Sequence, residues 1–181
     1  MDTDWYDDRW AKLEAAGNNI HGEADFVMRF APRSVLDAGC GTGRVAIELA
    51  RRGVVTNGVD RDEPMIAAAR NKAPELDFAV CDLAAFSANQ QVDVVVMAGN
   101  VIIFVDPGTE GAVITNLANA VLPGGHLISG FQLHRSIGVE EYNAHALDAG
   151  LELVEHWSTW DRDPTSPTDD YAVLVHRKSN C

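Results

Sequence analysis

Short apolar runs alternate with amphipathic stretches along most of the chain, and this alternation predicts strands separated by helices. Residues 92–98 are almost all apolar, which is typical of a strand buried on both faces of a parallel sheet. The predicted strands are 34–37, 54–60, 76–81, 92–98, 126–131, 151–160 and 171–176. The helices predicted between the strands are 43–52, 62–73, 107–122 and 139–149.

This order of elements predicts an α/β fold with a doubly wound, mostly parallel sheet of seven strands and right-handed crossovers. No helix separates 151–160 from 171–176, so we expect these strands to pair antiparallel and to place a reversed strand last in the sheet. A chain of 181 residues is long enough for one domain with a full core. We therefore expect a single domain, with 33–181 as the sheet core and 1–32 as a helical N-terminal cap.

Two helices are predicted ahead of the first strand. The first, over 3–16, carries an aromatic stripe made of Trp5, Tyr6, Trp10 and Leu13. The second, over 20–31, places its apolar residues mostly on one face. Two roles stay open for this segment. It either covers the sheet as part of the core, or it folds over a bound ligand and carries the polar groups of His21 and Glu23 to it.

The most informative stretch is 35–44, with the sequence Val-Leu-Asp-Ala-Gly-Cys-Gly-Thr-Gly-Arg. An apolar strand runs into an acid, three glycines follow at every second position, and a helical pattern then begins. Glycine accepts a positive φ and lets a ligand lie against bare backbone. The helix that follows offers unpaired N–H groups and the positive end of its dipole. This strand–turn–helix context predicts a site for a ligand with a nucleotide-like or carboxylate end.

Three acids follow three successive predicted strands, namely Asp37, Asp60 and Asp82. Ligands of doubly wound sheets bind at the carboxyl ends of the strands, so these acids should border one site. Asp60 comes 17 positions after Gly43, close to the roughly 20 expected for an acid that accepts hydrogen bonds from ribose hydroxyls. Asn100 follows Gly99 where strand 92–98 ends, and the pair forms either a strand-breaking turn or a set of ligand contacts.

The glycine-rich stretch resembles the first motif of class I S-adenosylmethionine-dependent methyltransferases, which is an acid followed by G-x-G-x-G. Asp37, Gly39, Gly41 and Gly43 match that motif position by position. The resemblance extends over roughly residues 33–131, and the reversed last strand is a further similarity. It implies S-adenosylmethionine as the cofactor and methyl transfer as the reaction, and it leaves the acceptor open.

The resemblance also implies how the cofactor would be held. Asp60 would accept from both ribose hydroxyls, Asp82 would bind the adenine amino group, and the backbone of Leu83 would bind a ring nitrogen. The methionine part would lie along Gly39 and Cys40.

The ammonium group of the methionine part would be oriented by Asp37, and Asn100 would lie near it and the methyl group. The branch that methylates exocyclic amines of bases has Asn/Asp-Pro-Pro-aromatic at this point. Residues 100–103 are Asn-Val-Ile-Ile, so that branch is disfavoured.

Two alternatives stay open beside this interpretation. Gly41, Gly43 and Ala46 also satisfy the fingerprint of a nicotinamide dehydrogenase, in which Asp60 would serve equally well. Against it, Asp37 would place a negative charge beside the pyrophosphate, and Asp82 would have no role. The second alternative is a binding protein of the same fold without catalytic activity.

A general base is needed only if the acceptor holds a proton at neutral pH. The candidates are His21 and His134, and each could equally be structural or solvated. His145, His156 and His176 are predicted to lie on helix or strand surfaces. A small organic acceptor is favoured by the apolar and aromatic residues Trp5, Trp10, Phe104 and Phe131. The alternative is that these residues belong to the hydrophobic core.

Charge and composition narrow the partners and the compartment. The formal net charge of −13 disfavours nucleic acid as a partner. The acidic N-terminus does not resemble a signal peptide, and the apolar run 94–105 is too short to span a bilayer, so we expect a cytoplasmic protein without a membrane partner. The three cysteines are not spaced as metal ligands, and we expect them to be reduced thiols. No metal site is predicted.

Overall fold

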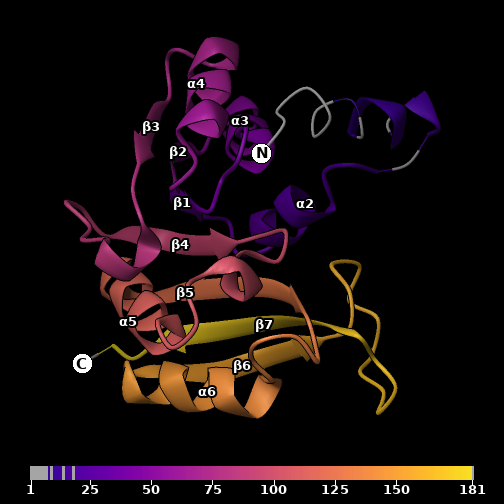
Figure 1. Cartoon of the computed structure of the whole chain (residues 1–181), viewed down its shortest axis with the longest axis vertical. Helices are drawn as coiled ribbons and strands as arrows, with labels where there is room; N and C mark the ends of the chain where they lie inside the picture. The colour runs from indigo at the N-terminus through magenta and orange to yellow at the C-terminus, as the bar shows by residue number, and fades with distance from the viewer. Residues whose placement is uncertain (1–7, 9, 14, 18, 181) are drawn as a thin grey trace.

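The structure is a computed structural model that describes residues 8, 10–13, 15–17 and 19–180. Its centre is a sheet of seven strands in the order β3-β2-β1-β4-β5-β7-β6 (Figure 1). All neighbouring strands pair parallel except β7, which pairs antiparallel with both β5 and β6. The predicted doubly wound sheet with one reversed strand is confirmed.

Every predicted strand, and every helix predicted between strands, is present. The strands are β1 (Ser34–Ala38), β2 (Val55–Asp60), β3 (Asp77–Val80), β4 (Val92–Met97), β5 (Val121–Gln132), β6 (Leu151–Trp157) and β7 (Tyr171–Lys178). The α-helices are α2 (Gly22–Met28), α3 (Arg44–Arg51), α4 (Glu63–Lys72), α5 (Glu110–Ala120) and α6 (Val139–Asp148). Two single 3₁₀ turns follow strands β3 and β4, namely η1 (Leu83–Ala85) and η2 (Val101–Phe104).

Several boundaries differ from the prediction, including those around β5 and the end of β6. Helix α5 ends at Ala120, and the next residues, predicted to be helical, already belong to β5, because Val121 pairs with Val92 of β4. Pro123, Gly124 and Gly125 therefore lie in an irregularity within β5 and not in a turn ahead of it. Strand β6 ends three residues early because Trp160 leaves the sheet and packs edge-on against Phe26 of α2.

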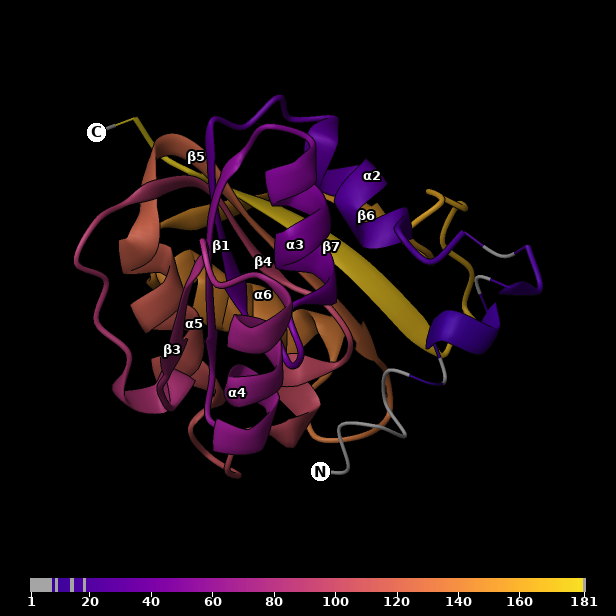
Figure 2. The same ribbon diagram turned by 90° about the horizontal axis from the view of Figure 1, so that it is seen from above.

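Helices cover both faces of the sheet (Figures 1 and 2). The face of α2 and α3 buries Val35 of β1, while the face of α5 and α6 buries Leu36 and Ala38. Because side chains alternate along a strand, Asp37 points to the same face as Val35, the face of α3. This alternation decides which helix the acid at the end of β1 meets.

Helix α2 belongs to the hydrophobic core. Ala24, Phe26 and Val27 are at most 1% exposed and pack in one cluster with residues of β1, α3 and β4. For this helix the core alternative is therefore correct, although Glu23 on the same helix turns toward α3. Within the first predicted helix, residues 8, 10–13 and 15 are helical, and Trp5 and Tyr6 lie outside the described residues.

His176 was predicted to lie on a surface, and this is wrong. Strand β7 lies between β5 and β6, so both of its faces are covered, and His176 is 1% exposed. Its Nε2 lies 2.9 Å from Oδ1 of Asn143 on α6, and its ring is 5.4 Å from that of Tyr142. Burial lowers the pKa of His176 to about 4, so the side chain is neutral at physiological pH.

Candidate functional site

The turn between β1 and α3 is shaped by its glycines. Gly39 and Gly43 have φ values of 78° and 83°, which side chains other than glycine rarely adopt. A Cβ atom on Gly39 would also lie 2.4 Å from a methyl carbon of Val101, and one on Gly43 would lie 2.9 Å from the ring of Phe78. Nothing larger than glycine fits either position, because the side chains of Val101 and Phe78 fill the space.

Asp60 is fixed against this glycine turn. Its Oδ2 accepts a hydrogen bond of 2.9 Å from the backbone N–H of Gly41, and its Oδ1 accepts one of 2.9 Å from the N–H of Asp62. The carbonyl of Val59 accepts from the N–H groups of Gly39 and Cys40, at 2.7 and 3.0 Å. The end of β2 therefore holds the turn, and a carboxylate retains acceptor sites for a ligand after two such bonds.

Asp37 is almost completely buried, with 2% of its surface exposed. Its Oδ2 accepts from the N–H of Ala46 in the first turn of α3, at 3.1 Å. Burial raises the pKa of Asp37 to about 7, although the positive charge of Arg44 acts in the opposite direction. A cation bound beside it would stabilise the ionised form.

A small pocket opens beside Asp37. It is lined by Asp37, Gly39, Cys40, Arg44, Val45, Ala98 and Gly99. The pocket thus joins the β1–α3 turn to the end of β4, the two neighbouring strand ends where a doubly wound sheet places its ligand. Burial, together with Asp37 and Asp60, raises the pKa of the Cys40 thiol, so this cysteine is no thiolate nucleophile.

Arg44 is a pocket residue that the sequence analysis did not single out. It directly follows Gly43, and its guanidinium forms a paired contact with the carboxylate of Glu23, at 2.6 and 2.9 Å. The ring of Trp10 lies 3.8 Å from its guanidinium carbon. The signal available in the sequence was its position, because Arg44 is the first residue of the helix whose N-terminus borders the predicted ligand site.

Asp82 and Leu83 lie at the end of the next strand, β3. Asp82 is exposed and caps the turn η1 by accepting from the N–H of Ala84 at 2.8 Å, while Leu83 is buried. The N–H of Cys81 donates to the carbonyl of Asp60 at 2.9 Å. The chain just before Asp82 is therefore held beside Asp60, and the ends of β1, β2 and β3 form one row.

Gly99 and Asn100 form a tight turn with φ values of 72° and 69°. Gly99 lines the pocket, whereas Oδ1 of Asn100 accepts from the N–H of Gln132 at 2.7 Å. The N–H of Asn100 in turn donates to the carbonyl of Gly130 at 3.3 Å. Asn100 thus ties the end of β4 to β5, and its contact with a cofactor stays a prediction.

Neither histidine candidate is among the residues that line the pocket. His21 directs its Nε2 toward Glu48 of α3, at 3.8 Å, and His134 is exposed after β5. Phe131 stacks on Tyr142 in the core, so it does not contact an acceptor, and Phe104 is 61% exposed. Within the described ranges, no group of His, Cys, Asp or Glu could hold a metal ion.

Comparison with known proteins identifies the class. The methyltransferase domain family matches residues 35–125, which run from β1 into β5. A crystal structure of a TehB-like SAM-dependent methyltransferase from Corynebacterium glutamicum is 33% identical, covers 98% of both chains and superposes with a TM-score of 0.91. The chain belongs to the methyltransferase domain family, and the predicted superfamily is confirmed.

Other relatives are more distant or match a part of the chain. A putative methyltransferase of Geobacillus sp. (strain WCH70) is 37% identical over 38% of this chain and 29% of its own length. A putative methyltransferase of Invertebrate iridescent virus 6 is 27% identical over 76% of this chain and 49% of its own length. The match thus spans less than half of these two curated relatives. Among the helices described, none is long and apolar enough to cross a membrane.

Proposed function

We propose that the protein transfers a methyl group from S-adenosylmethionine to a small organic acceptor. The observation that carries this proposal is that the buried Asp37 lines a pocket at the glycine turn. Asp60, at the end of the neighbouring strand, accepts a hydrogen bond from the same turn. The pocket offers an acid to an ammonium group, and Asp60 offers acceptors to ribose hydroxyls. Family membership and the SAM dependence of the Corynebacterium glutamicum relative support the same cofactor.

Each site residue then has a role in binding. When bound, S-adenosylmethionine supplies an activated methyl group on a sulfonium centre. Asp37 orients the ammonium group, the backbone of Gly39 and Cys40 supports the methionine part, and Asp60 holds the ribose. Asp82 and the backbone of Leu83 take the adenine.

The contribution of the chain to methyl transfer is chiefly alignment. Holding two reactants in line supplies up to about 7–11 kcal/mol in ideal cases. His21 and His134 remain weak candidates for a general base, since both lie outside the pocket lining. An acceptor that is already a nucleophile at neutral pH needs no base.

Isothermal titration calorimetry tests the cofactor directly. We expect the protein to bind S-adenosylmethionine and S-adenosylhomocysteine and to show no heat of binding with NAD. Binding of NAD alone would mean that the glycine turn serves a dinucleotide and that the proposal is wrong.

The affinity for S-adenosylmethionine should increase with pH as Asp37 ionises. With a pKa of about 7 without ligand, Asp37 must lose a proton to pair with an ammonium group, so affinity should rise about tenfold between pH 5.5 and 7. Titrations in matched buffers measure this, and Asp37→Asn should be weak and nearly independent of pH. An equal pH dependence in both proteins would show that another group titrates.

A screen of small metabolites for methyl transfer separates an enzyme from a binding protein. A [4+2]-cyclase, which is 18% identical, shares the fold with a TM-score of 0.69, so the fold by itself does not fix the reaction. Formation of S-adenosylhomocysteine that depends on one acceptor would support the proposal. Cofactor binding without turnover across acceptors with oxygen, nitrogen, sulfur and carbon nucleophiles would favour the binding protein.

A further inference from the structure

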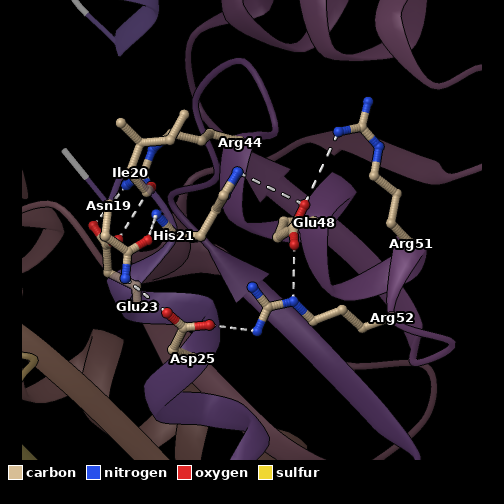
Figure 3. Close-up of polar contacts among 9 residues, drawn as sticks. All are labelled: Asn19, Ile20, His21, Glu23, Asp25, Arg44, Glu48, Arg51 and Arg52. Atoms are coloured by element: carbon tan, nitrogen blue, oxygen red, sulfur yellow. Dashed lines mark hydrogen bonds and ion pairs between the residues drawn. The ribbon is translucent and has the colours of Figure 1, made fainter. Parts of the chain in front are cut away.

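Two groups of ion pairs join the N-terminal segment to α3 (Figure 3). The inner pair is Glu23 with Arg44. The outer cluster is Asp25 and Glu48 with Arg52, at 2.6 and 2.8 Å from the arginine nitrogens. Both groups link α2 to α3, but they differ in burial and in their position relative to the pocket.

The inner pair is buried and borders the pocket. The side chains of Glu23 and Arg44 are 12% and 11% exposed, whereas those of Asp25 and Arg52 are 50% and 27% exposed. Arg44 lines the pocket and Arg52 does not. Burying an ion pair costs desolvation free energy that the attraction between the charges often does not repay, so this buried pair calls for an explanation beyond attachment of α2.

The pocket presents opposite charges to a ligand. Asp37 and Arg44 are both among its lining residues. A group with an ammonium and a carboxylate on one carbon would meet a carboxylate on one side and a guanidinium on the other. The planar fork of a guanidinium matches a carboxylate in geometry as well as charge.

Glu23 fixes where that guanidinium lies. Both of its carboxylate oxygens contact the terminal nitrogens of Arg44, and one of these nitrogens also donates to the carbonyl of Ile20. The ring of Trp10 covers the guanidinium. Three parts of the N-terminal segment thus hold one side chain of the pocket in place.

We propose that Arg44 binds the α-carboxylate of the cofactor's amino-acid group and that Glu23 is the positioning residue that holds Arg44 for it. This inference rests on the proposed cofactor. It gives the N-terminal segment a part in ligand recognition that is separate from the packing of α2 in the core. Holding the arginine beforehand reduces the conformational entropy lost on binding.

The test compares two thioether ligands that differ in the amino-acid group. S-adenosylhomocysteine carries it, and 5′-methylthioadenosine lacks it. Arg44→Gln should weaken S-adenosylhomocysteine about tenfold or more, because a charge-assisted bond is lost, and leave 5′-methylthioadenosine unchanged within about twofold. Glu23→Gln should weaken S-adenosylhomocysteine about threefold to fivefold with the same selectivity.

Arg52→Gln is the matched control, since it breaks the outer cluster between the same two helices. Both ligands should bind it as they bind the wild type. Arg44→Lys keeps a positive charge without the fork, and it should lie between wild type and Arg44→Gln, which covers the case in which the glutamine variant does not fold.

The outcomes separate this inference from the proposed function. If neither ligand binds the wild type, the proposed function is wrong. If both ligands bind the wild type and folded Arg44 variants weaken them equally, or weaken neither, Arg44 does not recognise the carboxylate. Tighter binding of S-adenosylhomocysteine by Glu23→Gln would show that Glu23 competes for Arg44 and does not position it.

Discussion

Replacing Asp60 with alanine should weaken the binding of S-adenosylmethionine by about tenfold to a hundredfold. In the proposed binding mode the carboxylate accepts from the two ribose hydroxyls, and losing hydrogen bonds to a charged group costs about 1.5–3 kcal/mol. The same substitution removes the acceptors of the Gly41 and Asp62 N–H groups. A moderate loss of stability should therefore accompany the loss of affinity.

The measurement is calorimetry on protein shown to be folded by circular dichroism. Glu63→Ala is the matched control, because Glu63 is an exposed acid three residues further on, in the first turn of α4. It removes the same charge without removing an acceptor at the turn. If Asp60→Ala and Glu63→Ala bind equally well, the ribose is held elsewhere and the role assigned to Asp60 is wrong.

Acidification should destabilise the protein through His176 by about 2–3 kcal/mol at pH 4.5 relative to pH 7.5. The pKa of His176 is about 4 in the folded protein, below the ordinary histidine value of 6.5. The unfolded chain therefore binds more protons between these values. The contribution of His176 is fully present above pH 6.5 and is lost as the pH falls toward 4.

Asp37 acts in the opposite direction. Its pKa of about 7 lies above the ordinary aspartate value of 3.8, so its burial weakens the fold as pH rises from about 4 to 7. The readout for His176 is therefore the difference in unfolding free energy between the wild type and His176→Gln, from urea titrations at each pH. Parallel stability curves for the two proteins would mean that His176 is not protonated on unfolding.

Local sequence signals predicted most of the framework. The alternation of apolar runs and helical patterns located every strand, and the missing helix before 171–176 predicted the antiparallel strand. The acids at the strand ends were likewise predictable, because each one directly follows an apolar run that predicts a strand. In the structure Asp37 lines the pocket and Asp60 accepts from the glycine turn, while their contacts with a cofactor stay predictions.

Contacts between distant segments were not predictable in the same way. The pair of Glu23 and Arg44 joins two helices that are separated by the first strand, and nothing in either helix pattern identifies the partner. The burial of His176 follows from the insertion of β7 between β5 and β6, which is a property of the sheet order and not of residues 171–176. The engagement of Asn100 with Gln132 depends likewise on the register of β4 against β5.

The position of β7 has a consequence for how the chain reaches its native state during synthesis. Within the described sheet, β6 pairs with β7 and has no other neighbour, so β6 cannot join the sheet until residues 171–178 have left the ribosome. Until then the edge of β5 that pairs with β7 is exposed, and Leu127 and Ile128 lack their pairing partners on β7. Such late, sequence-distant pairing slows folding and exposes an aggregation-prone edge. The nascent chain therefore depends on its last strand to complete both the sheet and the burial of α6.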